Sequence, residues 1–252
     1  MSFGRDKSTY TADEVIAVLQ RTYLPTIITE GKDDYFVFRR LEGYFSPLQV
    51  SLLPVGSKGC ALSVFDRREE LPQNLRVAFI VDKDNWVFVG IPDQYRVESL
   101  ITTDGYSIEN DLFVDGNLCS LMHADEFESF SRDVAEYMKW YSFAASQIMG
   151  GMNCKLDHPI DVIVPRGRSL NAAFQASVGM DSYPEDLYAS LMSEYERVLR
   201  GKSLILLLLR YLNAKGRPAT YRRAALLEIG AARSGDRMNA IREQVATLLQ
   251  TG

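Results

Sequence analysis

Short apolar runs alternate with amphipathic stretches over residues 12–81 of the chain. Apolar runs rich in β-branched residues, each bounded by turn residues, predict buried strands at residues 26–29, 48–55 and 76–81. Apolar positions at helical spacing predict helices at residues 12–21, 33–41 and 60–70, the first of them behind a capping-box pattern from Thr11 to Glu14. Strands that alternate with helices over short turns favour a parallel sheet. We therefore expect an α/β core whose parallel sheet is flanked by helices.

The pattern changes to mostly helix in the second half of the chain. Apolar residues recur at helical spacing over residues 123–149, 184–199, 202–213, 220–231 and 236–249. No internal repeat or low-complexity segment separates this half from the first. We expect two parts, an α/β core over residues 22–118 and a C-terminal helical region over residues 119–252 that packs on the core without a flexible linker.

Composition is that of an ordinary globular protein, with 46% hydrophobic and 24% charged residues. The longest uninterrupted apolar run covers residues 204–209, whereas a membrane span needs roughly 18 apolar residues or more. The first residues of the chain lack the apolar core of a signal peptide. These features predict a cytoplasmic protein without a membrane span.

The cysteines do not form a pattern that indicates a disulfide framework or a zinc site. Cys60, Cys119 and Cys154 are an odd number at wide spacings, and only His123 and His158 are available to join them as metal ligands. We expect the three thiols to be buried, reduced and inert.

The net charge of −5 discourages tight, unspecific binding to nucleic acid, but it hides a basic segment. Residues 197–242 contain eleven Lys and Arg residues against two acids, a local net charge of +9. Such a segment is either the solvated face of several helices or a surface that follows a phosphate backbone. The charge pattern alone does not choose between the two.

Acidic residues follow two of the three predicted strands. Glu30 comes directly after the first, while Asp82 and Asp84 come after the third. Functional groups of open parallel sheets gather beyond the carboxyl ends of the strands, and residues i and i+2 of an extended chain project to one side. Asp34 lies one helical turn after Glu30, within reach of the same point. Four carboxylates repel one another unless a hard cation such as Mg²⁺ or Mn²⁺ lies among them, so we expect a metal site.

Each of these acidic motifs also fits a purely structural role. The run DKDN at residues 82–85 is good turn chemistry, and EGKDD at residues 30–34 is a good helix start. Their joint position after two strands is what favours the metal site over these structural roles.

The same residues carry a resemblance to a known family. TEGKDD at residues 29–34, VDKD at residues 81–84 and YSIEN at residues 106–110 resemble the motifs of the toprim fold. The closer likeness is to stand-alone toprim nucleases of bacterial anti-phage systems, the AriB-like effectors of the phage anti-restriction-induced system. These are related to the overcoming-lysogenization-defect nucleases. The resemblance covers mainly residues 25–112.

What the resemblance implies is a site that binds Mg²⁺ or Mn²⁺. The implied metal ligands are Glu30, Asp34, Asp82, Asp84 and Glu109. Glu109 would lie near a second metal ion, and Asp111 is a weaker candidate because its equivalent is often apolar or aromatic. Lys202 resembles the late lysine of the nuclease branch, and with Glu30 it would be catalytic.

Lys202 also fits two roles that involve no nuclease chemistry. It is equally well described as a solvated residue at a helix N-terminus, where positive charge is mildly unfavourable. Gly201-Lys202-Ser203 also suggests a nucleotide-binding P-loop, but that pattern requires glycine at position 196, where the chain has Glu196. The P-loop interpretation is therefore excluded.

The leading hypothesis is a metal-dependent nuclease that acts as a toxic effector in anti-phage defence. It would cleave phosphodiester bonds in RNA or DNA, and the AriB likeness suggests transfer RNA. The basic late helices would hold the nucleic-acid backbone through Arg217, Arg222 and Arg223. The resemblance also implies control by an AriA-like ATPase subunit in trans and a homodimer in the active state. The alternative is a non-catalytic toprim-like module that binds a partner or a nucleotide, with carboxylates salt-bridged to Lys32, Lys58 and Lys83.

Overall fold

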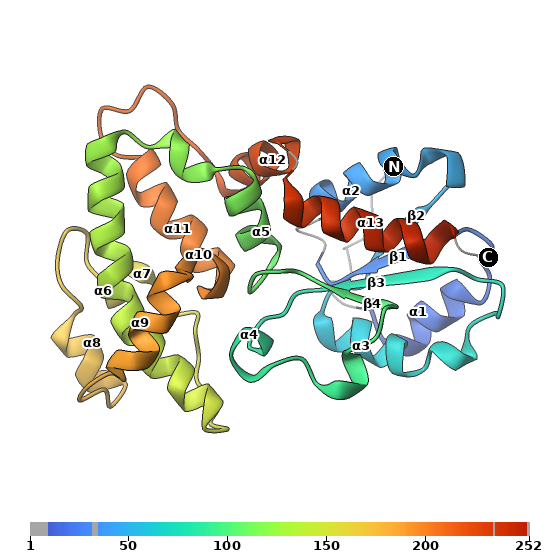
Figure 1. The fold of residues 1–252 in the computed structure, drawn as a ribbon, viewed down its shortest axis with the longest axis horizontal. Coiled ribbons are helices and arrows are strands. Elements are labelled where there is room, and N and C mark those ends of the chain that lie inside the picture. Colours follow the sequence, from blue (N-terminus) through green and yellow to red (C-terminus); the bar gives the residue numbers. More distant parts are fainter. Residues whose placement is uncertain (1–9, 32–34, 234, 251–252) are drawn as a thin grey trace, which may run out of the picture. The chain divides into compact units, whose positions relative to one another are not determined.

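The computed structural model describes residues 10–31, 35–233 and 235–250, and Figure 1 shows the fold. The chain divides into two compact units. The first contains the described parts of residues 1–82, 92–103 and 239–252, and the second contains those of residues 83–91 and 104–238. None of the helices in the described ranges combines the length and the hydropathy that crossing a bilayer requires.

A four-stranded, all-parallel sheet forms the centre of the first unit. Its strands are β1 (Thr26–Thr29), β2 (Ser51–Pro54), β3 (Val77–Val81) and β4 (Leu100–Thr102), in the order β2-β1-β3-β4. In the register of the sheet Thr29 pairs with Pro54 on one side and with Ile80 on the other. All four residues of β1 are buried, as expected for an apolar run at the centre of a parallel sheet. The α/β class predicted from the sequence is confirmed.

Helices accompany this sheet in the chain order that the sequence predicts. They are α1 (Ala12–Leu19), α2 (Tyr35–Tyr44), α3 (Lys58–Asp66) and most of α13 (Asp236–Gln250). The predicted capping box is present, because Thr11 Oγ1 accepts from the Glu14 N–H and the Glu14 carboxylate accepts from the Thr11 N–H. Ser57 caps α3 by accepting from the Cys60 N–H.

Two predicted boundaries of the first unit are wrong. The strand predicted at residues 48–55 is shorter, because Pro47 lies in a 3-10 turn, η1 (Ser46–Leu48), directly before β2. The helix predicted up to residue 70 ends at Asp66 and is followed by a second 3-10 turn, η2 (Arg68–Glu70). A further 3-10 turn, η3 (Asp93–Tyr95), precedes β4.

The last helix of the chain is part of the same unit as the first strand. Its side chains Ile241, Val245 and Leu249 are buried. Arg76 Nη1 donates to the carbonyl oxygen of Leu249 at 2.7 Å. The guanidinium of Arg242 lies 4.6 Å from the centre of the Tyr44 ring, in α2. The sheet unit is therefore built from residues at both ends of the described chain.

The second unit is helical in its described residues. Its helices are α4 (Trp86–Val89), α5 (Ile108–Asp115), α6 (Ala124–Met149), α7 (Ile160–Ile163), α8 (Ala172–Ser177), α9 (Glu185–Ser193), α10 (Tyr195–Val198), α11 (Gly201–Leu212) and α12 (Arg223–Arg233), with one 3-10 turn, η4 (Leu118–Leu121). The core of this unit is aromatic along α6, where Tyr137, Trp140 and Tyr141 are almost fully buried. Buried leucines of α11, such as Leu204 and Leu208, also belong to this core.

The helices predicted in this half exist, with two differences. The stretch predicted at residues 184–199 is interrupted, because Glu194 between α9 and α10 leaves the helical conformation at φ −131° and ψ 31°. The helix predicted from residue 220 begins only at Arg223, after Pro218.

Candidate functional site

Glu30 and Asp82 lie together at the carboxyl edge of the sheet. Each directly follows a strand, β1 for Glu30 and β3 for Asp82, and these two strands are neighbours. The Asp82 N–H donates to Glu30 Oε1 at 2.7 Å, and the ammonium group of Lys58 donates to the Asp82 carbonyl oxygen. Both acids are half-buried. The edge therefore brings the Glu30 carboxylate, the backbone of Asp82 and the ammonium group of Lys58 together in a partly desolvated position.

Asp84 differs from the sequence-based prediction in its backbone. Its φ of +48° lies in the left-handed region, and its N–H donates to the Tyr106 carbonyl oxygen at 2.7 Å. Asp82 and Asp84 would project to one side only on an extended chain, and that conformation ends before Asp84. Asp84 belongs to the second unit. Asp34, the fourth predicted ligand, lies outside the described residues.

Glu109 is a buried carboxylate in the first turn of α5, with its side chain 3% exposed. Arg223 Nη2 donates to Glu109 Oε1 at 2.6 Å. Burial opposes ionisation of Glu109, but the charge of Arg223 and hydrogen bonds that include one from Ser107 outweigh it, so the pKa of Glu109 is lowered. Glu109 is thus a stable anion whose charge Arg223 already compensates.

Asp111 lies two residues further along α5 and is fully buried. Its carboxylate accepts from the backbone N–H groups of Asp104 at 2.9 Å and Gly105 at 2.8 Å, and Arg237 approaches it at 3.4 Å. Burial raises the pKa of Asp111 to about 6 despite these favourable partners. These contacts give Asp111 a structural task, which is to hold the loop before α5.

Lys202 is exposed in the first turn of α11. The preceding Gly201 packs so closely on α5 that an added Cβ would lie 2.8 Å from the Glu109 Cβ. Asn110 joins α5 to α10, which directly precedes α11, because its Nδ2 donates to the carbonyl oxygens of Glu196 and Leu199, both at 2.8 Å. The second unit therefore brings the start of α5 and the start of α11 together, a proximity that the sequence does not reveal.

The basic residues expected to hold nucleic acid are not equally available. Arg217 donates to the Leu121 carbonyl oxygen at 2.6 Å and lies 3.3 Å from Glu126, and Arg223 is paired with Glu109. Arg222 is exposed. Two of the three arginines thus have intramolecular partners that a nucleic acid would have to replace.

The donor atoms at the sheet edge fit a hard divalent cation in chemistry but are few in number. Glu30 and Asp82 supply carboxylate oxygens, the ligand type that Mg²⁺ and Mn²⁺ prefer. Over the described residues there is no group of three or more His, Cys, Asp or Glu side chains placed to hold one ion. No protein-family model matches this chain, and no curated protein matches it either.

Proposed function

We propose that this protein is a metal-dependent nuclease that uses the carboxyl edge of its parallel sheet. The observation that carries the proposal is the contact between Glu30 and Asp82, at the ends of the adjacent strands β1 and β3. Chemistry in open parallel sheets concentrates at this edge. The resemblance of the surrounding motifs to toprim nucleases supports the same location.

Each acid of the site has a proposed task. Glu30, Asp34, Asp82 and Asp84 would hold Mg²⁺ or Mn²⁺, and Glu109 would lie near a second ion. The metal would supply an activated water and neutralise charge on the scissile phosphate. Lys58, whose ammonium group donates to the Asp82 carbonyl oxygen, keeps a positive charge beside Asp82. Lys202 would add positive charge where the transition state gains negative charge.

The second candidate is a non-catalytic module that binds a partner or a nucleotide. It is favoured by the second unit, where Glu109 and Asp111 have Arg223 and Arg237 as charge partners. Acids compensated in this way need no metal for stability. This candidate expects that removing the charge of Glu30 changes no enzymatic activity.

A cleavage assay separates the two candidates. Purified protein is incubated with total transfer RNA and with plasmid DNA, each with Mg²⁺, Mn²⁺ or EDTA. Glu30→Gln keeps an oxygen that can accept from the Asp82 N–H but removes the charge, so it should abolish cleavage without unfolding the edge. The matched control is Glu69→Gln, an exposed acid of η2. Equal cleavage by all three proteins would refute the site assignment.

The biological setting follows from the same proposal. The AriB likeness points to a toxic cytoplasmic effector of anti-phage defence, active as a homodimer and held in check by an AriA-like ATPase subunit in trans. Expression of the protein alone should then slow bacterial growth, whereas Glu30→Gln and co-expression with the ATPase should each restore it. Growth that the wild-type protein leaves unaffected would contradict the role of restrained toxin.

A further inference from the structure

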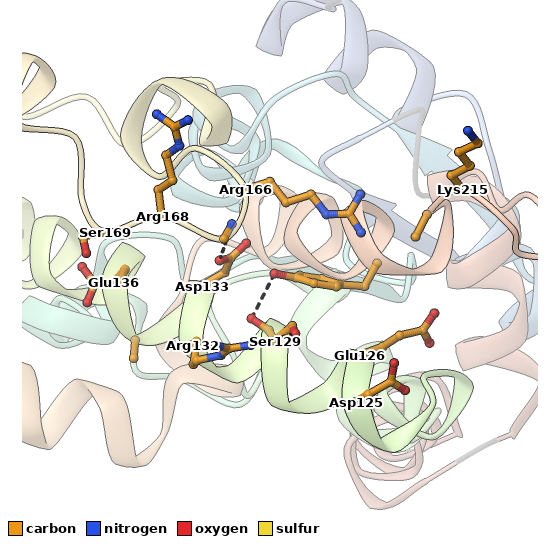
Figure 2. Close-up of a pocket in the computed structure, with 14 residues that line it drawn as sticks. Asp125, Glu126, Ser129, Arg132, Asp133, Glu136, Arg166, Arg168, Ser169 and Lys215 are labelled. Carbon is orange, nitrogen blue, oxygen red and sulfur yellow. Dashed lines mark hydrogen bonds between the residues drawn. The ribbon is translucent and has the colours of Figure 1, made fainter.

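The second unit contains an open groove whose walls carry many charges. Its cavity volume is about 590 Å³, within the roughly 300–1,000 Å³ of ligand sites. Side chains of α6, of the loop between α7 and α8, and of the end of α11 line it. Figure 2 shows the lining residues. The groove contains none of the residues of the proposed metal site.

The acids of the groove are already neutralised, with one exception. Asp133 forms an ion pair with Arg210. The Glu136 carboxylate lies 2.6 Å from the Lys139 ammonium group, and the Glu126 carboxylate lies 3.3 Å from the Arg217 guanidinium. The three cations of these pairs are outside the lining. Asp125 is the one acid of the lining to which the described part of the chain gives no cation.

The cations of the groove, in contrast, lack acidic partners. Among the described residues no carboxylate lies within ion-pair distance of Arg132, Arg166, Arg168 or Lys215. Arg132 donates to the Ser129 hydroxyl at 3.0 Å, and the guanidinium of Arg166 lies 5.2 Å from the centre of the Tyr211 ring. With its paired acids compensated from outside the lining, the groove presents, among the described residues, four cations without an acidic partner against one acid without a cation, an excess of positive charge within an acidic chain.

The loop that presents two of these arginines is held in place from α6. The Gly167 N–H donates to Asp133 at 3.3 Å, and the Leu170 N–H donates to Glu136 at 2.9 Å. Asp133 and Glu136 are one helical turn apart, so they hold the loop at two points. Gly167 has a φ of +67°, a conformation that favours glycine and turns the chain between Arg166 and Arg168. The two arginines therefore stand on a fixed backbone.

The arrangement of the cations fits a chain of phosphates better than one phosphate. In Figure 2 Arg168 and Lys215 lie at opposite sides of the view, with Arg166 between them. The buried Tyr211 ring is covered by Arg166, so it offers no free face on which a base could stack. Contacts to phosphates alone carry no sequence information.

We propose that this groove binds the phosphodiester backbone of a nucleic acid, without preference for sequence. The inference deepens the proposed nuclease function, since it names where that enzyme would hold its substrate away from the metal. Binding can be measured with no metal present and hence with no cleavage, which keeps the test independent of catalysis.

The test uses the full chain, a fluorescent single-stranded RNA of roughly 15 nucleotides and EDTA throughout. Anisotropy gives the Kd at several salt concentrations. Each phosphate contact to a single strand adds about 0.7 to the slope of log affinity against log salt. Arg166→Gln/Arg168→Gln should therefore lower the slope by about 1.4 and weaken binding roughly twentyfold near 0.1 M salt. Lys215→Gln alone should give about half of that slope change.

A control with the same change in net charge separates the groove from general electrostatics. Arg21→Gln/Arg39→Gln removes two exposed arginines of the sheet unit and should leave Kd and slope close to wild type. The proposal is overturned if wild-type protein does not bind the RNA, or if the groove variants bind like the control. It is also overturned if ATP displaces the RNA completely at micromolar concentration, because the groove would then be a nucleotide site. RNA binding in EDTA, combined with no cleavage in the assay with Mg²⁺ or Mn²⁺, would refute the nuclease proposal and leave the groove proposal standing.

Discussion

The guanidinium of Arg223 and the carboxylate of Glu109 face each other at 2.6 Å, although 114 residues separate them along the chain. The Glu109 side chain is 3% exposed, so loss of its partner would leave a buried charge without compensation. The pair therefore holds α12 against α5. It also determines whether the negative charge of Glu109 is available to bind another cation.

Arg223→Gln should lower the free energy of unfolding by about 3 kcal/mol, because it leaves Glu109 charged and unpaired. Urea unfolding followed by circular dichroism measures the loss. The double variant Glu109→Gln/Arg223→Gln should be more stable than the single one, since it removes both charges. Arg222→Gln, at the exposed neighbouring position, should stay within about 0.5 kcal/mol of wild type. Equal stability of the Arg223 and Arg222 variants would show that the pair contributes nothing.

Metal binding at the sheet edge should be visible without catalysis. An ion that binds only the folded protein stabilises it by about 2.7 kcal/mol at a hundred times its Kd, which raises Tm by roughly 5 °C or more. A thermal melt with Mn²⁺ should show this shift for wild type and for Glu69→Gln. Glu30→Gln should lose it. A shift of the same size in Glu30→Gln would show that the metal ion binds elsewhere than at this edge.

Gly201 and Gly59 each lie in the first turn of a helix. We expect alanine at these two positions to change the free energy of unfolding in opposite directions. An alanine Cβ at Gly201 would overlap the Ser107 hydroxyl and lie 2.8 Å from Asn110 Oδ1, whereas at Gly59 nothing lies within 4 Å. Gly201→Ala should therefore destabilise the protein by about 1–3 kcal/mol through overpacking. Gly59→Ala should stabilise it by about 0.5–1 kcal/mol, because alanine favours the helix. Differential scanning calorimetry of both variants tests the expected difference in sign.

The three thiols should differ in their reaction with iodoacetamide. Burial, helped by the charge of Glu196, raises the pKa of Cys119 to about 12, and burial also raises the pKa of Cys60 and of Cys154. A raised pKa keeps the thiol protonated, and only the thiolate reacts. Between pH 7 and 9 we expect mass spectrometry to find Cys154 modified first and Cys119 unmodified. Preferential labelling of Cys119 in the folded protein would contradict this order, and urea-unfolded protein should label at all three.

The sequence predicts the sheet well where the strands are long enough to leave a pattern. The runs that become β1 and β3 are apolar and end in acids, so the meeting of Glu30 and Asp82 could be expected. β4 has only three residues and escapes prediction, since so short a run cannot be told from a loop. The start of α5 does carry a signal, because Ser107 and Asn110 form a capping box.

Long-range pairing is what the sequence could not predict. The basic segment at residues 197–242 counts as one surface in the sequence, yet Arg210, Arg217 and Arg223 have acidic partners from α5 and α6. The groove could not be predicted for the opposite reason, because among the described residues its arginines have no acidic partner although acids lie beside them. Arg166 and Arg168 lie outside that segment, and they remain available only because folding supplies Asp133 and Glu136 with other partners.

The position of α13 has a consequence for synthesis on the ribosome. Residues 239–250 belong with the sheet, where Leu249 accepts from Arg76, but they are translated after every residue of the helical unit. Domains generally fold as their residues emerge. The helical unit can therefore be complete while the sheet still lacks the buried side chains Ile241 and Val245. We expect the edge that holds Glu30 and Asp82 to reach its final form only after residues 239–250 have emerged and packed on the sheet.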